Sequence, residues 1–220
     1  MKSPTPQYVI WDWNGTLLDD VGLCLKVMNS FLSAKGRSLL NLESYRRHFT
    51  IPVADFYTNI GINFESETAY QKAANDFHDE YEEHVYTCQL HTGAKALVAL
   101  LKQRSIGQSI LSGLPHNLLE RHLSHFGIRQ FFDVISGAAN THARGKLDRA
   151  QGFMEALRLK PEQTILIGDT IHDAEVSQHL GIRCLLVASG CYSAERLAPA
   201  GFPVLTNLTD VALELSVEME

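Results

Sequence analysis

Short apolar runs alternate with amphipathic helical patterns along most of this chain, and this alternation constrains the fold more than any other feature. Apolar runs bounded by polar residues or glycine are typical of buried strands. They lie at residues 8–11, 108–112, 133–136, 164–168 and 184–188, with a short last run at 203–205. Apolar residues at helical spacing lie at 93–103, 115–126, 147–157 and 173–180. Because such alternation favours right-handed βαβ crossovers, we expect an α/β fold: a Rossmann-like parallel sheet with helices on both faces.

Residues 20–90 interrupt this rhythm. They are polar, with apolar residues at helical spacing over 21–34, 42–49, 53–60 and 67–85, and no strand is expected among them. The sequence therefore predicts an all-helical cap at 20–90, inserted after the first strand into an α/β core of residues 1–19 and 91–220. A lid of this kind would exclude water from a site at the sheet edge. A packing module that contacts no ligand is the alternative.

Composition narrows the range of partners. Among 220 residues, 19 basic and 25 acidic side chains give a net charge of −6, and no basic stripe is visible, so we expect no nucleic-acid partner. No apolar run approaches the ~20 residues that span a bilayer, and residues 1–7 lack the apolar core of a signal peptide. The four cysteines form no Cys-x-x-Cys pair, which favours free thiols in the cytoplasm. Neither membrane association nor any oligomeric state is predicted.

Polar residues that could act in catalysis or bind a ligand follow the expected strands or precede the expected helices. In open α/β sheets this carboxyl edge is where ligands bind. A carboxylate there can be a nucleophile or a metal ligand, and a hydroxyl beside glycine can bind phosphate. An ammonium can neutralise a phosphoryl group, and two carboxylates four residues apart suit Mg²⁺. The residues concerned are Asp12, Ser112 with Gly113, Lys146, and Asp169 with Asp173. Taken singly, each has an ordinary alternative as a turn residue, solvated lysine or helix N-cap.

Taken together, these residues resemble the four motifs of the haloacid dehalogenase superfamily in order and context. The stretch Asp12-Trp13-Asn14-Gly15-Thr16 is similar to the first motif of that family, Asp-x-Asp-Gly-Thr. The position of the helical insert and the segments 45–52 and 56–61 also resemble the phosphoglycolate-phosphatase-like branch. The resemblance covers nearly the whole chain.

The resemblance implies a Mg²⁺-dependent phosphomonoester hydrolase that acts on a small phosphorylated metabolite. It implies that Asp12 attacks phosphorus and becomes an aspartyl-phosphate. It also implies that Mg²⁺ is held by Asp12, the backbone carbonyl of Asn14 and Asp169, with Asp173 as a more distant partner that orients Lys146. Phosphoryl oxygens would be bound by Ser112, the amide of Gly113 and Lys146, and Thr16 would brace the turn.

Asn14 departs from the family pattern, which has a second aspartate there as general acid and base. An amide has no titratable proton near neutral pH, and general acid–base catalysis contributes about 10²- to 10⁴-fold. The sequence thus predicts either slow hydrolysis or a substrate with an acidic leaving group, such as an acyl or aryl phosphate. Alternatively, deamidation before Gly15 could restore an aspartate, or another group could substitute. The candidates for that role are Asp19, Asp20, His116, His142 and His172.

Two other functions stay open at this point. One is a non-catalytic protein that binds a phosphorylated metabolite or regulates a partner; retention of Asp12 argues against it, because a binder gains nothing from a nucleophile that faces phosphate. The other is phosphonate or carbon–halogen hydrolysis, although those branches place Ala or Tyr where this chain has Asn14. Substrate choice is expected to lie in the cap, with Arg46, Arg47 and Tyr57 as candidates.

Overall fold

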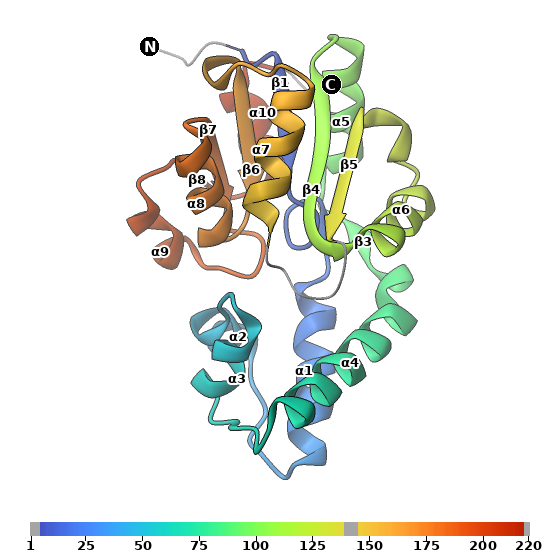
Figure 1. The fold of residues 1–220 in the computed structure, drawn as a ribbon, viewed down its shortest axis with the longest axis vertical. Coiled ribbons are helices and arrows are strands. Elements are labelled where there is room, and N and C mark those ends of the chain that lie inside the picture. The colour runs from blue at the N-terminus through green and yellow to red at the C-terminus, as the bar shows by residue number, and fades with distance from the viewer. Residues whose placement is uncertain (1–4, 139–144, 218–220) are drawn as a thin grey trace.

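The computed structural model describes residues 5–138 and 145–217, and it contains the predicted parallel sheet (Figure 1). The sheet has six strands in the order β5-β4-β1-β6-β7-β8, and all neighbouring pairs are parallel. The strands are β1 (Tyr8–Trp11), β4 (Gly107–Pro115), β5 (Val134–Ala138), β6 (Thr164–Gly168), β7 (Arg183–Val187) and β8 (Val204–Leu205). β1 is therefore central, although it comes first in the chain.

Helices cover both faces of the sheet, as the alternating pattern predicted. The apolar side chains of α5 (Ala94–Gln103), α6 (His116–His125) and α10 (Leu208–Glu214) pack on one face. Those of α7 (Lys146–Ala156) and α8 (Ile171–Leu180) pack on the other, and the short α9 (Ala194–Leu197) adjoins them. Since successive side chains of a strand alternate between faces, Val9 and Trp11 belong to the first layer and Ile10 to the second.

The insert folds into four helices that lie beyond the carboxyl ends of the strands (Figure 1). They are α1 (Val21–Ala34), α2 (Leu42–His48), α3 (Val53–Asn59) and α4 (Glu67–His84), each within one residue of its predicted bounds. Side chains cap two of them: Asn41 accepts from the backbone N–H of Ser44, and Ser66 accepts from that of Ala69. No helix within 5–138 or 145–217 is long and apolar enough to cross a membrane.

One expectation about the insert was wrong. Residues 89–90 form a strand, β3 (Gln89–Leu90), which pairs antiparallel with β2 (Leu18–Asp19). Two-residue strands are too short to show an alternating pattern, so they could not be predicted from periodicity. The pairing holds the two connections between sheet and helical insert side by side.

Candidate active site

Strand register brings the sequence-predicted residues to one edge of the sheet. Trp11, the last residue of β1, pairs with Ile110 of β4 and with Ile167 of β6. Asp12 continues the ladder, because its N–H donates to the carbonyl of Ile167 at 2.9 Å. Asp12 and Asp169 follow β1 and β6, whereas Ser112 lies within β4, which continues to Pro115. All three lie toward the edge of the sheet that faces the helical insert (Figure 1).

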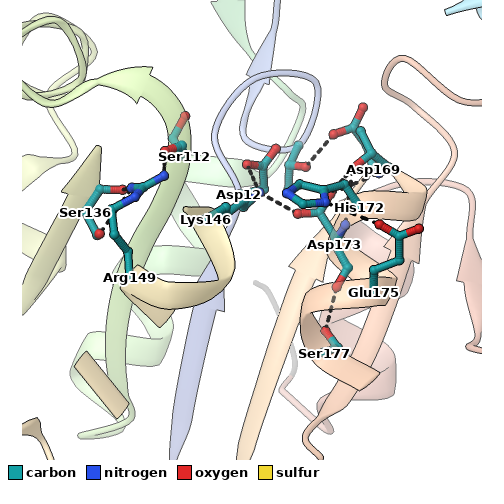
Figure 2. A network of polar contacts seen from close by, with 12 residues as sticks. Asp12, Ser112, Ser136, Lys146, Arg149, Asp169, His172, Asp173, Glu175 and Ser177 are labelled. Carbon is teal, nitrogen blue, oxygen red and sulfur yellow. Dashed lines mark hydrogen bonds and ion pairs between the residues drawn. The ribbon is translucent and has the colours of Figure 1, made fainter. Parts of the chain in front are cut away.

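Lys146 lies between two of the aspartates (Figure 2). Its Nζ donates to Oδ1 of Asp12 at 2.7 Å and to Oδ1 of Asp173 at 2.6 Å. The lysine is the first residue of α7 and follows Gly145, whose φ of +99° is a conformation that glycine adopts without strain. With the side chain of Lys146 only 6% exposed, these ion pairs are shielded from water.

Asp169 is fully buried and fixed on both carboxylate oxygens. The hydroxyl of Thr16 donates to Oδ1 at 3.1 Å, and the backbone N–H of Cys191 donates to Oδ2 at 2.6 Å. Two glycines allow this close approach. A Cβ on Gly15 would lie 2.5 Å from Oδ2 of Asp169, and one on Gly190 would lie closer still.

Asp173 has two roles at once. Its Oδ1 accepts from Lys146, and its Oδ2 accepts from the N–H and hydroxyl of Thr170 at 3.1 and 2.6 Å. The second set forms the capping box of α8, in which the Thr170 side chain also accepts from the backbone N–H of Asp173. Asp173 therefore both caps α8 and belongs to the site. Both of its carboxylate oxygens already accept hydrogen bonds, from Lys146 and from Thr170.

The charges of this cluster do not balance. Ligand oxygens of Asp12, Asp169 and Asp173 lie within 4.8 Å of one another, and Lys146 is the cation in contact with two of them. Burial, partly offset by Lys146, raises the pKa of Asp12 to about 6. Burial and the two neighbouring aspartates raise the pKa of Asp169 well above its ordinary value.

For Lys146 and Asp173, in contrast, the pKa shifts favour the charged form of each group. Burial alone would raise the pKa of Asp173, but Lys146 and Thr170 lower it overall; burial would lower that of Lys146, but Asp12 and Asp173 raise it. The excess negative charge thus lies on Asp12 and Asp169. Clustered carboxylate oxygens with uncompensated charge fit a hard divalent cation such as Mg²⁺.

Ser112 is held in place by an arginine that the sequence did not single out. Arg149 donates from Nη2 to the carbonyl of Ser112 and from Nη1 to that of Ser136, both at 2.8 Å (Figure 2). The Ser112 hydroxyl accepts from the N–H of Leu114, two residues on, at 3.1 Å. Arg149 lies one helical turn after Lys146 on α7. This helix therefore contacts Asp12, which follows β1, through Lys146, and Ser112 of β4 through Arg149. The three-residue spacing from Lys146 was the only feature of the sequence that could have indicated Arg149 as a site residue.

Asn14 faces an acidic partner. Its Nδ2 donates to Oδ2 of Asp20 at 2.7 Å and to the hydroxyl of Tyr81 in α4 at 2.8 Å. Of the described groups that were considered as substitutes for the missing acid, Asp20 contacts Asn14. Asp19 is exposed, and His172 lies 3.4 Å from Glu175. His142 is outside the described residues.

The three cap candidates for substrate selection differ in their surroundings. Arg46 donates to the carbonyls of Ser189 and Gly190 in the loop after β7, at 2.7 and 2.9 Å. Arg47 is exposed and pairs with Glu43 on its own helix. Tyr57 is 1% exposed and packs among aromatic rings, so its position supports a role in cap packing.

The chain is similar to known proteins in both sequence and fold. The family model for haloacid dehalogenase-like hydrolases matches residues 9–187. The tyrosine-protein kinase PtkA of Mycobacterium tuberculosis is 25% identical over 209 residues, with 94% of this chain and 70% of PtkA covered. Phosphoglycolate phosphatase 1 of Pseudomonas aeruginosa is 24% identical, with coverages of 94% and 78%. The fold is that of a predicted phosphatase from Clostridium acetobutylicum, at a TM-score of 0.80, 24% identity and coverages of 96% and 98%.

Proposed function

The chain belongs to the haloacid dehalogenase-like hydrolases, and on this basis we propose that it is a phosphomonoester hydrolase that uses Asp12 as nucleophile. The observation that carries the proposal is the setting of Asp12. Its carboxylate ends the central strand, contacts the buried ammonium of Lys146 at 2.7 Å and lies beside two further carboxylates. A solvated carboxylate or a simple structural ion pair would not need this cluster.

The reaction we propose has two displacements at phosphorus. An oxygen of Asp12 forms a bond to phosphorus while the bond to the alcohol oxygen of the substrate breaks. Water then attacks the same phosphorus, the Asp12–phosphorus bond breaks, and the carboxylate is regenerated. Lys146 offsets the repulsion between Asp12 and the anionic phosphoryl group, an effect that is strong in a site shielded from water.

Mg²⁺ fits the donor set that remains. Asp12, Asp169 and the backbone carbonyl of Asn14 would hold it, with Asp173 as a more distant partner because both of its oxygens are engaged. When bound, the cation supplies positive charge that offsets the charge of the phosphoryl group. Ser112, the amide of Gly113 and Lys146 would bind the phosphoryl oxygens.

We further propose that residues 20–90 act as the cap and residues 1–19 and 91–220 as the core. The four insert helices lie beyond the carboxyl ends of the strands, on the side of the sheet where Asp12 lies (Figure 1). A small phosphorylated metabolite suits this arrangement better than a polymer.

Asn14 restricts the substrates further. Because its amide cannot protonate an alkoxide, good substrates are those whose leaving group needs no proton, such as acyl or aryl phosphates. The test is hydrolysis of an aryl phosphate and a panel of alkyl phosphate esters, with and without Mg²⁺. We expect turnover by the wild type, loss of it in Asp12→Asn, and faster turnover of the aryl ester.

Other results would point elsewhere. Binding of phosphate by a wild type that hydrolyses none of the esters would indicate a binding or regulatory protein. Turnover of a phosphonate or haloacid in place of the esters would indicate one of the other branches of the family. Since the relative PtkA is named a tyrosine kinase, the assay also includes a tyrosine peptide; phosphate found on the peptide would show transfer to an acceptor other than water.

A further inference from the structure

Asp20 occupies the N-cap position of α1, directly before Val21, but its side chain does not cap the helix. Asp is a favoured N-cap residue because its carboxylate accepts from the backbone N–H groups of the first turn. At Asp20 no such hydrogen bond forms. The carboxylate turns instead toward the loop that follows the nucleophile, where it accepts from the N–H of Gly15 at 2.8 Å and from Nδ2 of Asn14 at 2.7 Å.

Tyr81 completes a closed set of hydrogen bonds with these two residues. Its hydroxyl donates to Oδ2 of Asp20 at 2.6 Å and accepts from Nδ2 of Asn14 at 2.8 Å. Tyr81 is 4% exposed and Asp20 is 1% exposed, so water does not compete for these contacts. The tyrosine lies on α4, the last helix of the insert, whereas Asn14 belongs to the loop after β1. The insert therefore reaches the second residue after Asp12.

These contacts decide the orientation of the Asn14 amide. Oδ2 of Asp20 accepts the single hydroxyl hydrogen of Tyr81, and that hydroxyl oxygen can then only accept from Asn14, so the amide nitrogen faces both groups. The two hydrogens of Nδ2 are then fully used. Within the described part of the chain, nothing donates to the other end of the amide, the carbonyl oxygen Oδ1.

We propose that Asp20 and Tyr81 are positioning residues, which engage both amide hydrogens of Asn14 and so leave Oδ1 as the one group of this side chain able to bind the attacking water. This inference rests on the proposed phosphatase function. Oδ1 accepts a hydrogen bond from the water and orients it. The water oxygen bonds to phosphorus, the Asp12–phosphorus bond breaks, and the displaced proton is taken up by an oxygen of the departing phosphate.

The same contacts explain why asparagine suits position 14 in this chain. A carboxylate at position 14 would place its oxygen against Oδ2 of Asp20, where the contact is now 2.7 Å. Two carboxylates at that separation cannot both be ionised without strong repulsion. Asn14 and Asp20 are therefore a matched pair, one amide and one carboxylate, and exchanging the two should preserve the hydrogen bond.

The experiment compares Asp20→Asn, Tyr81→Phe, Asn14→Asp and the exchange variant Asn14→Asp/Asp20→Asn. Two matched controls are Asp19→Asn, which removes the neighbouring exposed carboxylate, and Tyr70→Phe, which removes a hydroxyl from the same helix. For each protein, kcat and KM for an aryl phosphate are measured with saturating Mg²⁺, and unfolding in urea gives the stability. Intact mass first verifies that Asn14 is not deamidated.

We expect Asp20→Asn and Tyr81→Phe to lower kcat by about 10- to 100-fold, the range for hydrogen bonds to a charged group, with KM nearly unchanged. The controls should match the wild type. The exchange variant should be more stable and more active than either of its single variants. Activity of Asp20→Asn and Tyr81→Phe equal to that of the controls would overturn the inference, as would additive effects in the exchange cycle.

The two proposals fail in different ways. Absence of turnover and of Mg²⁺-dependent beryllofluoride binding by the wild type would contradict the proposed function. The free energies of unfolding of the wild type, Asn14→Asp, Asp20→Asn and the exchange variant form a double-mutant cycle. Measuring this cycle requires no turnover, so it still tests the pairing of Asn14 with Asp20. Additivity in that cycle contradicts the inference whatever the activity of the protein.

Discussion

Asp12 and Asp169 carry the unbalanced charge of the site. Burial raises the pKa of Asp12 to about 6 from an ordinary value of 3.8, and the pKa of Asp169 is raised as well. Between pH 3.8 and about pH 6, the folded, metal-free protein therefore binds more protons than the unfolded chain. Its stability falls as the pH rises through that window, because ionisation places charge on buried carboxylates that lie beside one another.

A pH dependence of metal binding follows from the same shifts. Mg²⁺ requires ionised carboxylates, so protons compete with it below the raised pKa values. We expect Mg²⁺ affinity to be at least about tenfold weaker near pH 5 than near pH 7. Isothermal titration calorimetry in buffers of different ionisation enthalpy measures both the affinity and the protons released. Equal affinity at the two pH values, with no proton release, would show that these carboxylates do not bind the ion.

Some site residues could be predicted from the sequence because they follow strands or precede helices. Asp12, Lys146, Asp169 and Asp173 are of this kind, and the structure brings all four together. Their chemical roles remain proposals. Tyr81 could not be found this way, because its contact with Asn14 spans 67 positions and depends on how α4 is placed. A single buried tyrosine in an amphipathic helix looks like any other packing residue.

At the scale of elements, helix α2 is joined to the loop that supports Asp169. Arg46 donates to the carbonyls of Ser189 and Gly190, and the next residue, Cys191, donates its N–H to Asp169 at 2.6 Å. Arg196 strengthens the connection from the other side, since it donates to the carbonyls of Arg46 and Phe49. The insert thus contacts the loop that supports a proposed metal ligand.

This connection predicts different effects for two adjacent arginines. Arg46→Ala removes the contacts to the loop, so Asp169 loses a fixed orientation, and we expect Mg²⁺ to bind about tenfold more weakly. Arg47→Ala removes an exposed charge that pairs only within α2 and should leave Mg²⁺ affinity unchanged. Titration calorimetry of the two variants side by side makes the comparison. Similar affinities for both would mean that α2 does not support the site.

Another contact between insert and core passes through a histidine. His122 of α6 is fully buried; its Nδ1 accepts from Nε1 of Trp13 at 3.3 Å and its Nε2 lies 3.1 Å from Glu82 of α4. These surroundings support a packing role for His122. Glu82 as its partner could not be predicted, for the same reason that applies to Tyr81.

At the scale of the whole molecule, the fold was largely predictable and the junctions were not. Apolar runs of four or five residues between helical patterns are a strong signal, so the parallel sheet and the four insert helices lie where they were expected. The order of the strands depends on pairing over long distances. The ribbon of β2 and β3 was missed because two residues carry no periodicity. These junctions are also where Asp20 and Tyr81 meet the nucleophile loop.

The central claim is that Asp12 carries a phosphoryl group during turnover. In the most direct measurement, the protein is mixed with Mg²⁺ and an aryl phosphate, and the reaction is stopped in acid. The peptide that carries the phosphoryl group, which serves as the label, is then mapped by mass spectrometry. Because Asn14 offers no base for the water, we expect the aspartyl-phosphate to accumulate, with the label on Asp12 and none in Asp12→Asn. Hydrolysis of the ester with no label on Asp12, or with label at another residue, would contradict the account.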